Sequence, residues 1–415
     1  MRYGLIGEKL GHSFSKIIHE QLADYTYDLI PLTKEELDIF MTEKQFSALN
    51  VTIPYKETVI PYLDEVNAHA MKIGAVNTIV NRDGKLTGYN TDFYGFRYML
   101  QHNGIDVQNK KALVLGKGGA SKAVIAVLEE LGVKEILTVY YKENPETITY
   151  EECYQNHTDA EIIVNTTPVG MYPKADDCPI DLDKFPNLSG VADVVYNPLR
   201  TQLIIEAEKR GINAAGGLEM LVAQAKYAAE IFLDTKIEDN RIDEIHAGLV
   251  KERSNLVLIG MSGGGKTSLG RKAAKKLGKA FVDTDEEIVK RIGMPIADFF
   301  AQEGEAAFRE IETEVLHEFS AQNNLVISTG GGIVKNPLNV EYLKRNGHII
   351  WLKRDAELLQ SGHGRPLAPD KTATLKLYEE RLPLYTAAAE AIAENNGTAE
   401  EGLEALLNAY AATLK

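Results

Sequence analysis

The chain has little cysteine and no long apolar run. Its 415 residues include two cysteines, Cys153 and Cys178, without metal-ligand spacing around them. The sequence therefore suggests neither a disulfide framework nor a zinc site, and a reducing cytoplasm is the predicted compartment. Glu8, Lys9 and His12 interrupt the N-terminus before a signal sequence can build. No later stretch approaches the roughly 18 apolar residues of a transmembrane helix.

An excess of positive charge is also missing. The formal net charge is −15 at pH 7. Such a chain repels nucleic acid and anionic membrane on average, so we expect neither as a partner, and an anionic ligand must meet locally placed Lys and Arg. Heptads, short repeats and low-complexity segments do not occur. The length predicts two or three globular domains and leaves the oligomeric state open.

Two segments of strand, glycine loop and helix divide the chain. In the first, the apolar run 111–115 (KALVL) precedes the loop 116–121 (GKGGAS) and a helix predicted over 122–131. In the second, the apolar run 255–259 (NLVLI) precedes the loop 260–267 and another helix. Short, fully apolar runs are typical of parallel strands that are buried on both faces. The sequence therefore predicts an α/β fold.

The connection between these segments is predicted from its composition. Residues 234–254 are rich in charge and poor in large apolar side chains, which favours an exposed connection. We place the domain boundary near 247–253. Ahead of the first glycine loop, helical stretches alternate with strand-like runs such as 48–53 and 75–80. That region predicts a separate substrate-binding lobe with a ligand cleft beside it.

The loop 260–267 (GMSGGGKT) satisfies the complete phosphate-loop pattern. Its glycines let backbone N–H groups surround phosphate oxygens at a helix N-terminus. Lys266 can reach the β- and γ-phosphates, and Thr267 can bind Mg²⁺. A glycine-rich turn with a chance lysine is the alternative, but the strand before and the helix after the loop disfavour it. ATP and Mg²⁺ are the predicted ligands.

The residues after the phosphate loop narrow the substrate. An acidic pair ends the run AFVDTD, an arginine lies in FRE, a triple glycine follows LVIST, and two arginines lie in GRPL and ERLPLY. In this order they resemble shikimate kinase, across about 255–395. The resemblance implies that Asp285 holds the substrate hydroxyl and accepts or steers its proton, and that Asp283 supports Mg²⁺ through water. It implies that Arg309 and Arg381 bind the substrate carboxylate.

The same resemblance implies further contacts. The backbone is expected to approach the substrate closely at Gly330, Gly331 and Gly332. The residues expected to contact the nucleotide are Gly263, Gly264, Gly265, Lys266, Thr267, Ser268 and the lid arginine, Arg365. The lid 360–369 departs from the family because it is short and lacks an upstream basic residue often found beside the adenine.

The N-terminal half carries a second set of motifs: GHSFSKIIH, NVTIPYK, GAVNTI, GYNTDFYGF, NTTPVG, DVVYNP and GGLEMLVAQ. Together with the first glycine loop they resemble shikimate dehydrogenase, over about 3–232. The resemblance implies that Lys56 is the acid/base residue and that Asp92 pairs with it. Further implied substrate contacts are Ser13, Ser15, Thr52, Asn77, Tyr196 and Gln224. Lys56, Asp92, Lys266 and Asp285 are thus the predicted catalytic residues.

The dehydrogenase cofactor is expected to be NADP(H). Its implied contacts are Gly116, Lys117, Gly118, Gly119, Ala120, Ser121, Lys142, Val194 and Gly217. NADPH-dependent members commonly carry Asn-Arg-Thr after the second strand, whereas this sequence reads TVYYKE, with Lys142 followed by Glu143. Lys142 is a point charge for the 2′-phosphate, which Glu143 would repel. Lys117 offers another cation, and the strength of the preference over NAD stays open.

The two resemblances concern consecutive reactions, because one makes the C3 hydroxyl of shikimate and the other phosphorylates it. The substrates are then 3-dehydroshikimate and shikimate. We expect a substrate lobe over 1–100, a Rossmann-like cofactor lobe over 101–250, and a phosphate-loop kinase domain with a parallel sheet over 251–415. Two alternatives stay open: one half uses a related substrate such as quinate, or one half is a ligand-binding module without turnover.

Overall fold

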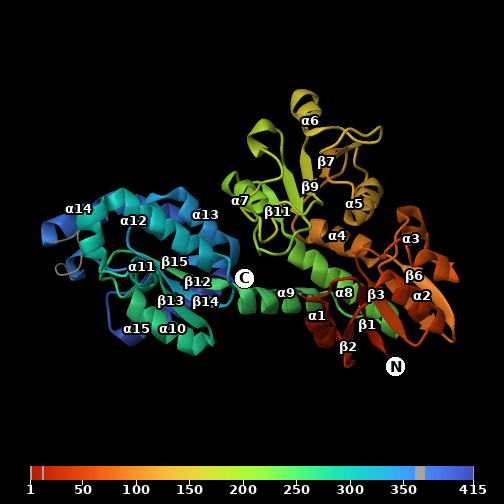
Figure 1. Cartoon of the computed structure of the whole chain (residues 1–415). Coiled ribbons are helices and arrows are strands. Elements are labelled where there is room, and N and C mark those ends of the chain that lie inside the picture. Colours follow the sequence, from red (N-terminus) through yellow and green to blue (C-terminus); the bar gives the residue numbers. More distant parts are fainter. Residues whose placement is uncertain (1, 12–13, 360–369, 415) are drawn as a thin grey trace. The chain divides into compact units, whose positions relative to one another are not determined.

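The computed structural model describes residues 2–11, 14–359 and 370–414. It divides into two compact units, Met1–His246 and Ala247–Lys415 (Figure 1). Both units combine helices with sheets whose strands are mostly parallel, so the predicted α/β class is confirmed. Ser13, Arg365 and the lid 360–369 lie outside the described residues.

The first sheet of the first unit has six strands in the order β2-β1-β3-β5-β6-β4. β1 pairs in parallel with β2 and β3, whereas β5 is antiparallel to β3 and β6. The elements of this lobe are β1 (Tyr3–Gly7), α1 (Ser15–Leu22), β2 (Tyr27–Pro31), α2 (Lys34–Glu43), β3 (Ala48–Val51), β4 (Glu65–Val66), α3 (Ala68–Ile73), β5 (Thr78–Arg82) and β6 (Lys85–Tyr89). The strand predicted over 48–53 ends at Val51 because the chain then turns, and Pro54 has no N–H for a ladder. The run 75–80 enters the sheet only at Thr78.

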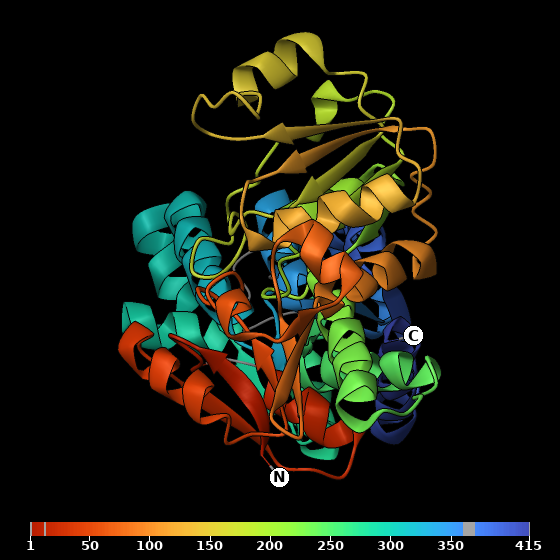
Figure 2. The same cartoon turned by 90° about the vertical axis from the view of Figure 1, so that its right-hand side faces the viewer.

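The second sheet is entirely parallel, with the order β11-β10-β9-β7-β8. Its elements are β7 (Lys111–Leu115), α5 (Gly119–Glu130), β8 (Glu135–Val139), α6 (Tyr150–Asn156), β9 (Ile162–Asn165), β10 (Gly190–Asp193), α7 (Gln202–Lys209) and β11 (Asn213–Ala215). α5 begins within the glycine loop, earlier than the predicted start at 122. α4 (Thr91–His102) and α8 (Gly217–Leu233) pack together (Figure 2). α4 contributes to the apolar core around β7, and α8 contributes to that core and to the apolar cluster around β1.

The second unit contains one parallel sheet in the order β13-β14-β12-β15-β16. Its elements are β12 (Asn255–Ile259), α10 (Lys266–Leu277), β13 (Ala280–Asp283), α11 (Thr284–Ile292), α12 (Ile296–Ser320), β14 (Leu325–Ser328), α13 (Pro337–Asn346), β15 (Gly347–Lys353), α14 (Lys371–Ala388), β16 (Ala391–Glu394) and α15 (Ala399–Thr413). Two apolar clusters cover opposite faces of the sheet, since alternate residues of β12 belong to each. The carboxyl ends of β12, β13 and β14 meet at one edge, where the phosphate loop begins.

The connection between the glycine-loop segments is largely exposed, as its composition predicts, but it also contains a helix that the composition did not predict. α9 spans Asn240–Arg253, and the division between the units falls inside it. Ile242, Ile245 and Leu249 on α9 are at most 1% exposed. Their spacing of three and four residues places them on one helical face. The high charge of the other positions obscured this apolar stripe in the sequence.

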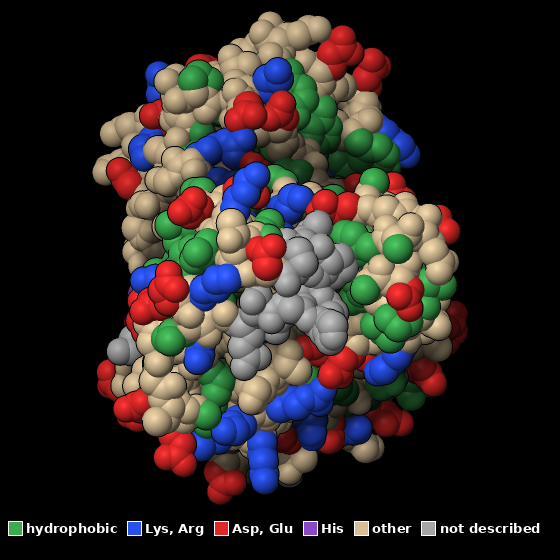
Figure 3. All heavy atoms as spheres, turned by 90° about the vertical axis from the view of Figure 1, so that its left-hand side faces the viewer, with side chains coloured by type: hydrophobic (Ala, Val, Ile, Leu, Met, Phe, Trp, Pro, Cys, Tyr) green, Lys and Arg blue, Asp and Glu red, His purple; other side chains and the backbone are tan. Residues whose placement is uncertain are grey.

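The surface carries both signs of charge. On the face drawn in Figure 3, Lys and Arg side chains are mixed with Asp and Glu rather than separated into large fields. Among the residues that the structure describes, no helix is long and apolar enough to cross a membrane.

Candidate active sites

Lys56 and Asp92 form the centre of the first candidate site. Lys56 lies in the turn after β3, and Asp92 lies in the first turn of α4. The Lys56 Nζ donates to Asp92 Oδ2 at 2.6 Å, with both side chains largely shielded from solvent. The helix N-terminus favours a negative charge at Asp92. The predicted pair is therefore assembled in the structure, and its ammonium group is held in a fixed place.

Asn77 fixes the carboxylate of this pair. Its Nδ2 donates to Asp92 Oδ1 at 2.9 Å, while its Oδ1 accepts from the Thr91 N–H at 2.7 Å. Asn50 lies behind Asn77 and donates to the Asn77 carbonyl oxygen at 3.2 Å, and Tyr27 donates to Asn50 Oδ1 at 2.7 Å. The Lys56–Asp92 pair is thus supported by a buried polar network that leaves its geometry little freedom.

The pair opens into a cavity of about 390 Å³. The predicted substrate contacts that line it are Ser15, Thr52, Lys56, Asn77, Asp92, Tyr196 and Gln224. They come from α1, the turn after β3, the segment before β5, α4, α8 and the segment after β10, which are distant in the sequence. The cavity gathers neutral hydrogen-bond donors around the paired ammonium of Lys56, and Lys9 also lines it, a set that suits a small hydroxylated anion.

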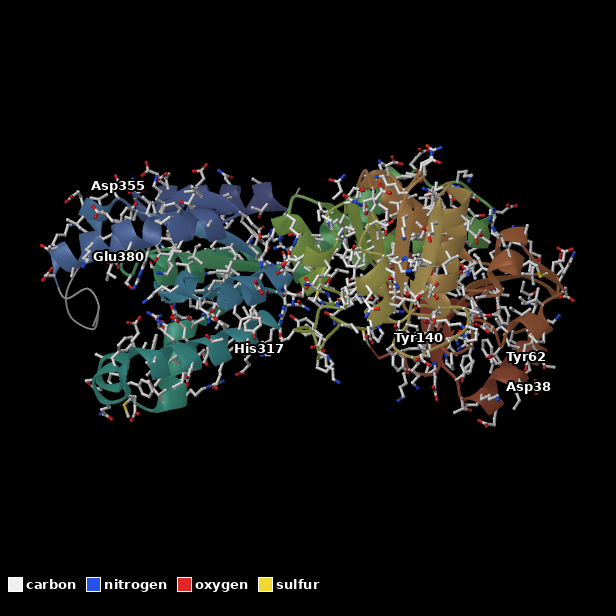
Figure 4. All side chains as sticks on the ribbon, turned by 90° about the horizontal axis from the view of Figure 1, so that it is seen from above. Asp38, Tyr62, Tyr140, His317, Asp355 and Glu380 are labelled. Carbon is white, nitrogen blue, oxygen red and sulfur yellow. The ribbon has the colours of Figure 1, made fainter. Side chains whose placement is uncertain are left out.

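A second cavity of the first unit, of about 690 Å³, lies at the carboxyl edge of the parallel sheet. Gly116, Lys117 and Gly118 line it, together with Tyr140 and other residues after the strands. Gly116 has a φ of +102°, and a Cβ there would lie 2.9 Å from Thr167 Cγ2, so the loop needs glycine. Figure 4 labels Tyr140 in the sheet region of this unit.

The other predicted cofactor residues have different places. Gly119, Ala120 and Ser121 form the first turn of α5. A Cβ at Gly217 would overlap the carbonyl oxygen of Val194, so these two residues touch each other, but neither is among the described residues that line the two cavities.

The phosphate loop and α10 form the candidate site of the second unit. Gly263 and Gly265 have φ values of +80° and +94°, which favour glycine. The Lys266 Nζ is buried and donates to the carbonyl oxygens of Gly260 and Met261 at 2.8 and 3.0 Å. A cavity of about 540 Å³ is lined by the predicted residues Gly263, Gly265, Lys266, Thr267, Ser268, Asp283 and Asp285. Gly264 is not among them, but its carbonyl oxygen accepts from Asn395 Nδ2 at 2.8 Å.

Thr267 and Asp283 meet at this cavity. The Thr267 hydroxyl donates to Asp283 Oδ2 at 2.7 Å. The other carboxylate oxygen accepts from the Asp285 N–H at 3.1 Å and caps α11. Burial, reinforced by the Asp283 carboxylate, raises the pKa of Asp285. Hydroxyl and carboxylate oxygens are suitable ligands for Mg²⁺, so this arrangement fits the predicted metal.

The triple glycine lies beside Asp285 at its first residue, and Arg309 and Arg381 lie against its other two glycines. The Arg309 Nη1 donates to Glu312 Oε2 at 2.7 Å. A Cβ at Gly330 would lie 2.8 Å from Asp285 Oδ1, and a Cβ at Gly332 would overlap the Arg309 guanidinium. Arg381 on α14 is 5% exposed, and its Nε has no hydrogen-bond partner among the described residues. The predicted substrate residues of this unit are therefore brought together.

Family models match both units. The model described as shikimate dehydrogenase substrate binding domain matches residues 5–79, and the model described as shikimate kinase matches 262–411. The shikimate dehydrogenase (NADP(+)) of Clostridium beijerinckii is 42% identical over 259 residues, which are 58% of this chain and 95% of that relative. The chain belongs to the shikimate dehydrogenase family. A shikimate kinase domain follows in the same chain.

Solved structures support the assignment of the dehydrogenase unit. A chorismate mutase/shikimate 5-dehydrogenase fusion protein from Clostridium acetobutylicum is 38% identical, with a TM-score of 0.56 over 60% of this chain and 96% of that one. Shikimate 5-dehydrogenase from Thermus thermophilus, in complex with NADP(H) and shikimate, is 29% identical, with a TM-score of 0.54 over 59% of this chain and 98% of that one.

Sequence reasoning missed several residues of both sites. In the dehydrogenase unit, Asn50 lines the substrate cavity, although it stands in the motif that indicated Thr52 and Lys56. In the kinase unit, Arg354 and Leu358 line the nucleotide cavity, and Glu312 is buried against Arg309. Arg354 follows β15, and a basic residue at the carboxyl end of a parallel strand was a usable signal. Glu312 had no such signal, because it looks like one of many helix surface acids.

Proposed function

We propose that this protein catalyses two consecutive reactions. The first unit reduces 3-dehydroshikimate to shikimate with NADPH, using a substrate lobe over 1–100 and a cofactor lobe over 101–250. The second unit, over 251–415, phosphorylates shikimate with ATP and Mg²⁺. The observation that carries the proposal is the presence in one chain of the largely shielded Lys56–Asp92 pair and of a complete phosphate loop beside Asp285.

The cavity at the carboxyl edge of the second sheet fits a dinucleotide. Its glycine loop leads into the N-terminus of α5, where backbone N–H groups attract a pyrophosphate. The positive φ of Gly116 keeps that loop close to the sheet. When bound, NADPH supplies the hydride for the carbonyl carbon.

Lys56 handles the proton of this reaction. Its ammonium group donates a proton to the carbonyl oxygen as that oxygen becomes a hydroxyl, and takes the proton back in the reverse direction. Asp92 accepts a hydrogen bond from this ammonium group at 2.6 Å and holds it at the wall of the cavity. Asn77 keeps the Asp92 carboxylate in place. Ser15, Thr52 and Gln224 offer neutral donors for the substrate carboxylate and ring hydroxyls.

Asp285 is the group that accepts a proton in the kinase unit. It lies in the nucleotide cavity, and its raised pKa makes it a better proton acceptor for the shikimate C3 hydroxyl than an ordinary aspartate. Thr267 and Asp283 would hold Mg²⁺, the second directly or through water. When bound, ATP supplies the phosphoryl group, and Lys266 neutralises charge on its phosphates.

The arginines of the kinase unit fit a substrate carboxylate. Arg381 Nε is a buried donor that lacks a protein acceptor in the described structure, and Arg309 lies against the triple glycine. A buried donor without an acceptor is costly, so a carboxylate that completes it gains affinity.

A single coupled assay tests the whole proposal. The protein is supplied with 3-dehydroshikimate, NADPH and ATP·Mg²⁺, while NADPH oxidation and ADP formation are followed together. Both signals should appear, and ADP formation should depend on shikimate when NADPH is omitted. Quinate with NADP⁺ is assayed in parallel. Faster turnover of quinate than of shikimate would reject shikimate as the substrate of the first unit. Absence of NADPH oxidation or of ADP formation would mark the corresponding unit as a module without turnover.

A further inference from the structure

Lys117 lies between the ends of two neighbouring strands in the cofactor lobe. β7 ends at Leu115 and β8 at Val139, and these two residues are paired across the sheet. The Gly116 N–H donates to the Val139 carbonyl oxygen at 2.9 Å, which ties the glycine loop to the end of β8. Lys117 and Tyr140 consequently line the same cavity.

An exposed loop after β8 supplies the present partners of Lys117. The Lys117 Nζ donates to Glu146 Oε2 at 2.6 Å and to Asn144 Oδ1 at 3.2 Å. Asn144 Oδ1 also accepts from the Glu146 N–H at 3.0 Å, so the loop presents both acceptors to one ammonium. The Glu146 side chain is 76% exposed. An ion pair with such an exposed partner is weak, and a phosphate dianion at the same place is a stronger partner for lysine.

Lys142 is less favourably placed for the same ligand. Its Nζ lies 5.0 Å from the centre of the Tyr141 ring, which is 68% exposed. It is not among the described residues that line the cavity, whereas Tyr141 is. In doubly wound folds the adenosine ribose lies between the glycine loop and the end of the second strand, where an acidic residue selects the unphosphorylated cofactor. Tyr140 and Tyr141 stand at that position here.

We propose that Lys117 determines the preference for NADPH by binding its 2′-phosphate, and that Glu146 is an internal competitor that occupies Lys117 when the phosphate is absent. The inference rests on the proposed dehydrogenase function. When NADPH binds, its 2′-phosphate replaces the Glu146 carboxylate as the partner of Lys117. When NADH binds, the Lys117–Glu146 pair stays intact. Glu146 therefore weakens NADPH binding without affecting NADH binding.

Binding of two adenosine fragments to the full-length protein tests this directly. Isothermal titration calorimetry compares 2′,5′-ADP with 5′-AMP, which lacks the 2′-phosphate. Lys117→Ala should weaken 2′,5′-ADP binding about 10- to 100-fold and change 5′-AMP binding less than about threefold. Lys117→Arg should retain the preference. Glu146→Gln should strengthen 2′,5′-ADP binding about 2- to 5-fold, because it removes only a weak exposed ion pair.

Two further variants are measured with the same fragments: a matched control and a variant of the alternative cation, Lys142. Lys110→Ala removes an equal charge at the opposite edge of the sheet, where Lys110 Nζ donates to Ser189 Oγ at 2.9 Å, and it should leave both fragments unaffected. Lys142→Ala tests the rival cation. An unchanged thermal unfolding profile of each variant, followed by circular dichroism, reports that both units are folded.

The outcomes separate this inference from the proposed function. An equal loss for both fragments in Lys117→Ala, or loss of the preference in Lys142→Ala instead, would overturn the assignment to Lys117. Weaker binding of 2′,5′-ADP to Glu146→Gln would overturn the role of Glu146. A protein that binds 2′,5′-ADP through Lys117 but does not reduce 3-dehydroshikimate would retain this inference and lose the proposed reaction.

Discussion

The Nζ of Lys56 lies 2.6 Å from Oδ2 of Asp92, and Asn77 holds the second oxygen of the same carboxylate. Water that takes the place of this ammonium group in a variant would not be held in the same position for proton transfer. Lys56→Ala should therefore lower kcat for 3-dehydroshikimate reduction by about 10²- to 10⁴-fold, measured as NADPH oxidation. Kinase turnover should stay unchanged.

Asp285→Asn is the reciprocal variant. It should abolish ADP formation and leave NADPH oxidation at the wild-type rate, because each change removes a proton-handling group from one site. Loss of both activities by either folded variant would be incompatible with two independent sites.

The sequence predicted the fold, and it indicated most of the residues that the structure gathers around the two candidate sites, because both depend on local patterns. Apolar runs ahead of glycine loops located β7 and β12, and the motif order located Lys56, Asp92 and Asp285. It did not predict α9, whose few apolar residues are effective only because they share one helical face. Nor did it indicate how Glu146 engages Lys117, since such a contact between loops depends on the tertiary fold.

His19 should make the first unit sensitive to acid. It is buried, stacks on Tyr27 at 4.1 Å, and contacts the Tyr25 hydroxyl at 2.6 Å. Burial lowers its pKa from 6.5 to about 3, so the unfolded chain binds a proton that the folded chain does not. The stabilisation is complete above pH 6.5 and is lost as the pH falls towards 3, by about 2 kcal/mol at pH 5.

The experiment compares the wild type with His19→Phe, which keeps a stacking ring but cannot titrate. Thermal inactivation of the reductase is followed at pH 7, 6 and 5, and the variant should lose less stability with falling pH than the wild type. Trp351, the single tryptophan, lies in the second unit, so its fluorescence reports the unfolding of that unit. As an internal control, this unfolding should not respond to the His19→Phe change. The same pH dependence in both proteins would show that His19 is not the group responsible.

Gly332→Ala should impair the use of shikimate by the kinase but not that of ATP. A Cβ at this position would overlap the Arg309 guanidinium, which would have to move away from Glu312. Gly332 has an ordinary φ of −98°, so the effect is steric rather than a matter of backbone strain. We expect kcat/KM for shikimate to fall by about 10- to 100-fold. An equal change in the KM values of both substrates would argue for a general distortion instead.

Arg354 should contribute to ATP binding in place of the basic residue that the lid lacks. It lines the nucleotide cavity, and its Nη1 donates to the Asn395 carbonyl oxygen at 3.0 Å, while Asn395 contacts the phosphate loop. Arg354→Ala should raise the KM for ATP about 5- to 50-fold and leave that for shikimate unchanged. Lys353→Ala is the matched control, because its neighbouring charge pairs with Glu394 at 2.9 Å. Equal effects of the two variants would indicate a general field effect. Figure 4 labels Asp355 in the same segment.

Shikimate made by the first unit should mix with the solvent before the second unit phosphorylates it. Flexibility of the connection does not supply the reason, since α9 is helical. The expectation rests on rates: at a typical turnover of about 10 per second, a small anion has far longer than it needs to leave an open cavity. The benefit of the fusion would then be matched synthesis of two enzymes rather than transfer of the intermediate.

Isotope dilution decides the matter. Labelled 3-dehydroshikimate is supplied with NADPH and ATP in the presence of excess unlabelled shikimate, and label in shikimate 3-phosphate is followed at early times. Dilution in proportion to the unlabelled pool is expected, because both sources of shikimate reach Arg309 and Arg381 through the same solvent. An Asp285→Asn protein mixed with a Lys56→Ala protein provides the control, since neither chain can then pass its own product internally. If the intact protein gives early product with clearly higher label than this mixture, shikimate passes between the units without equilibrating, and free diffusion is refuted.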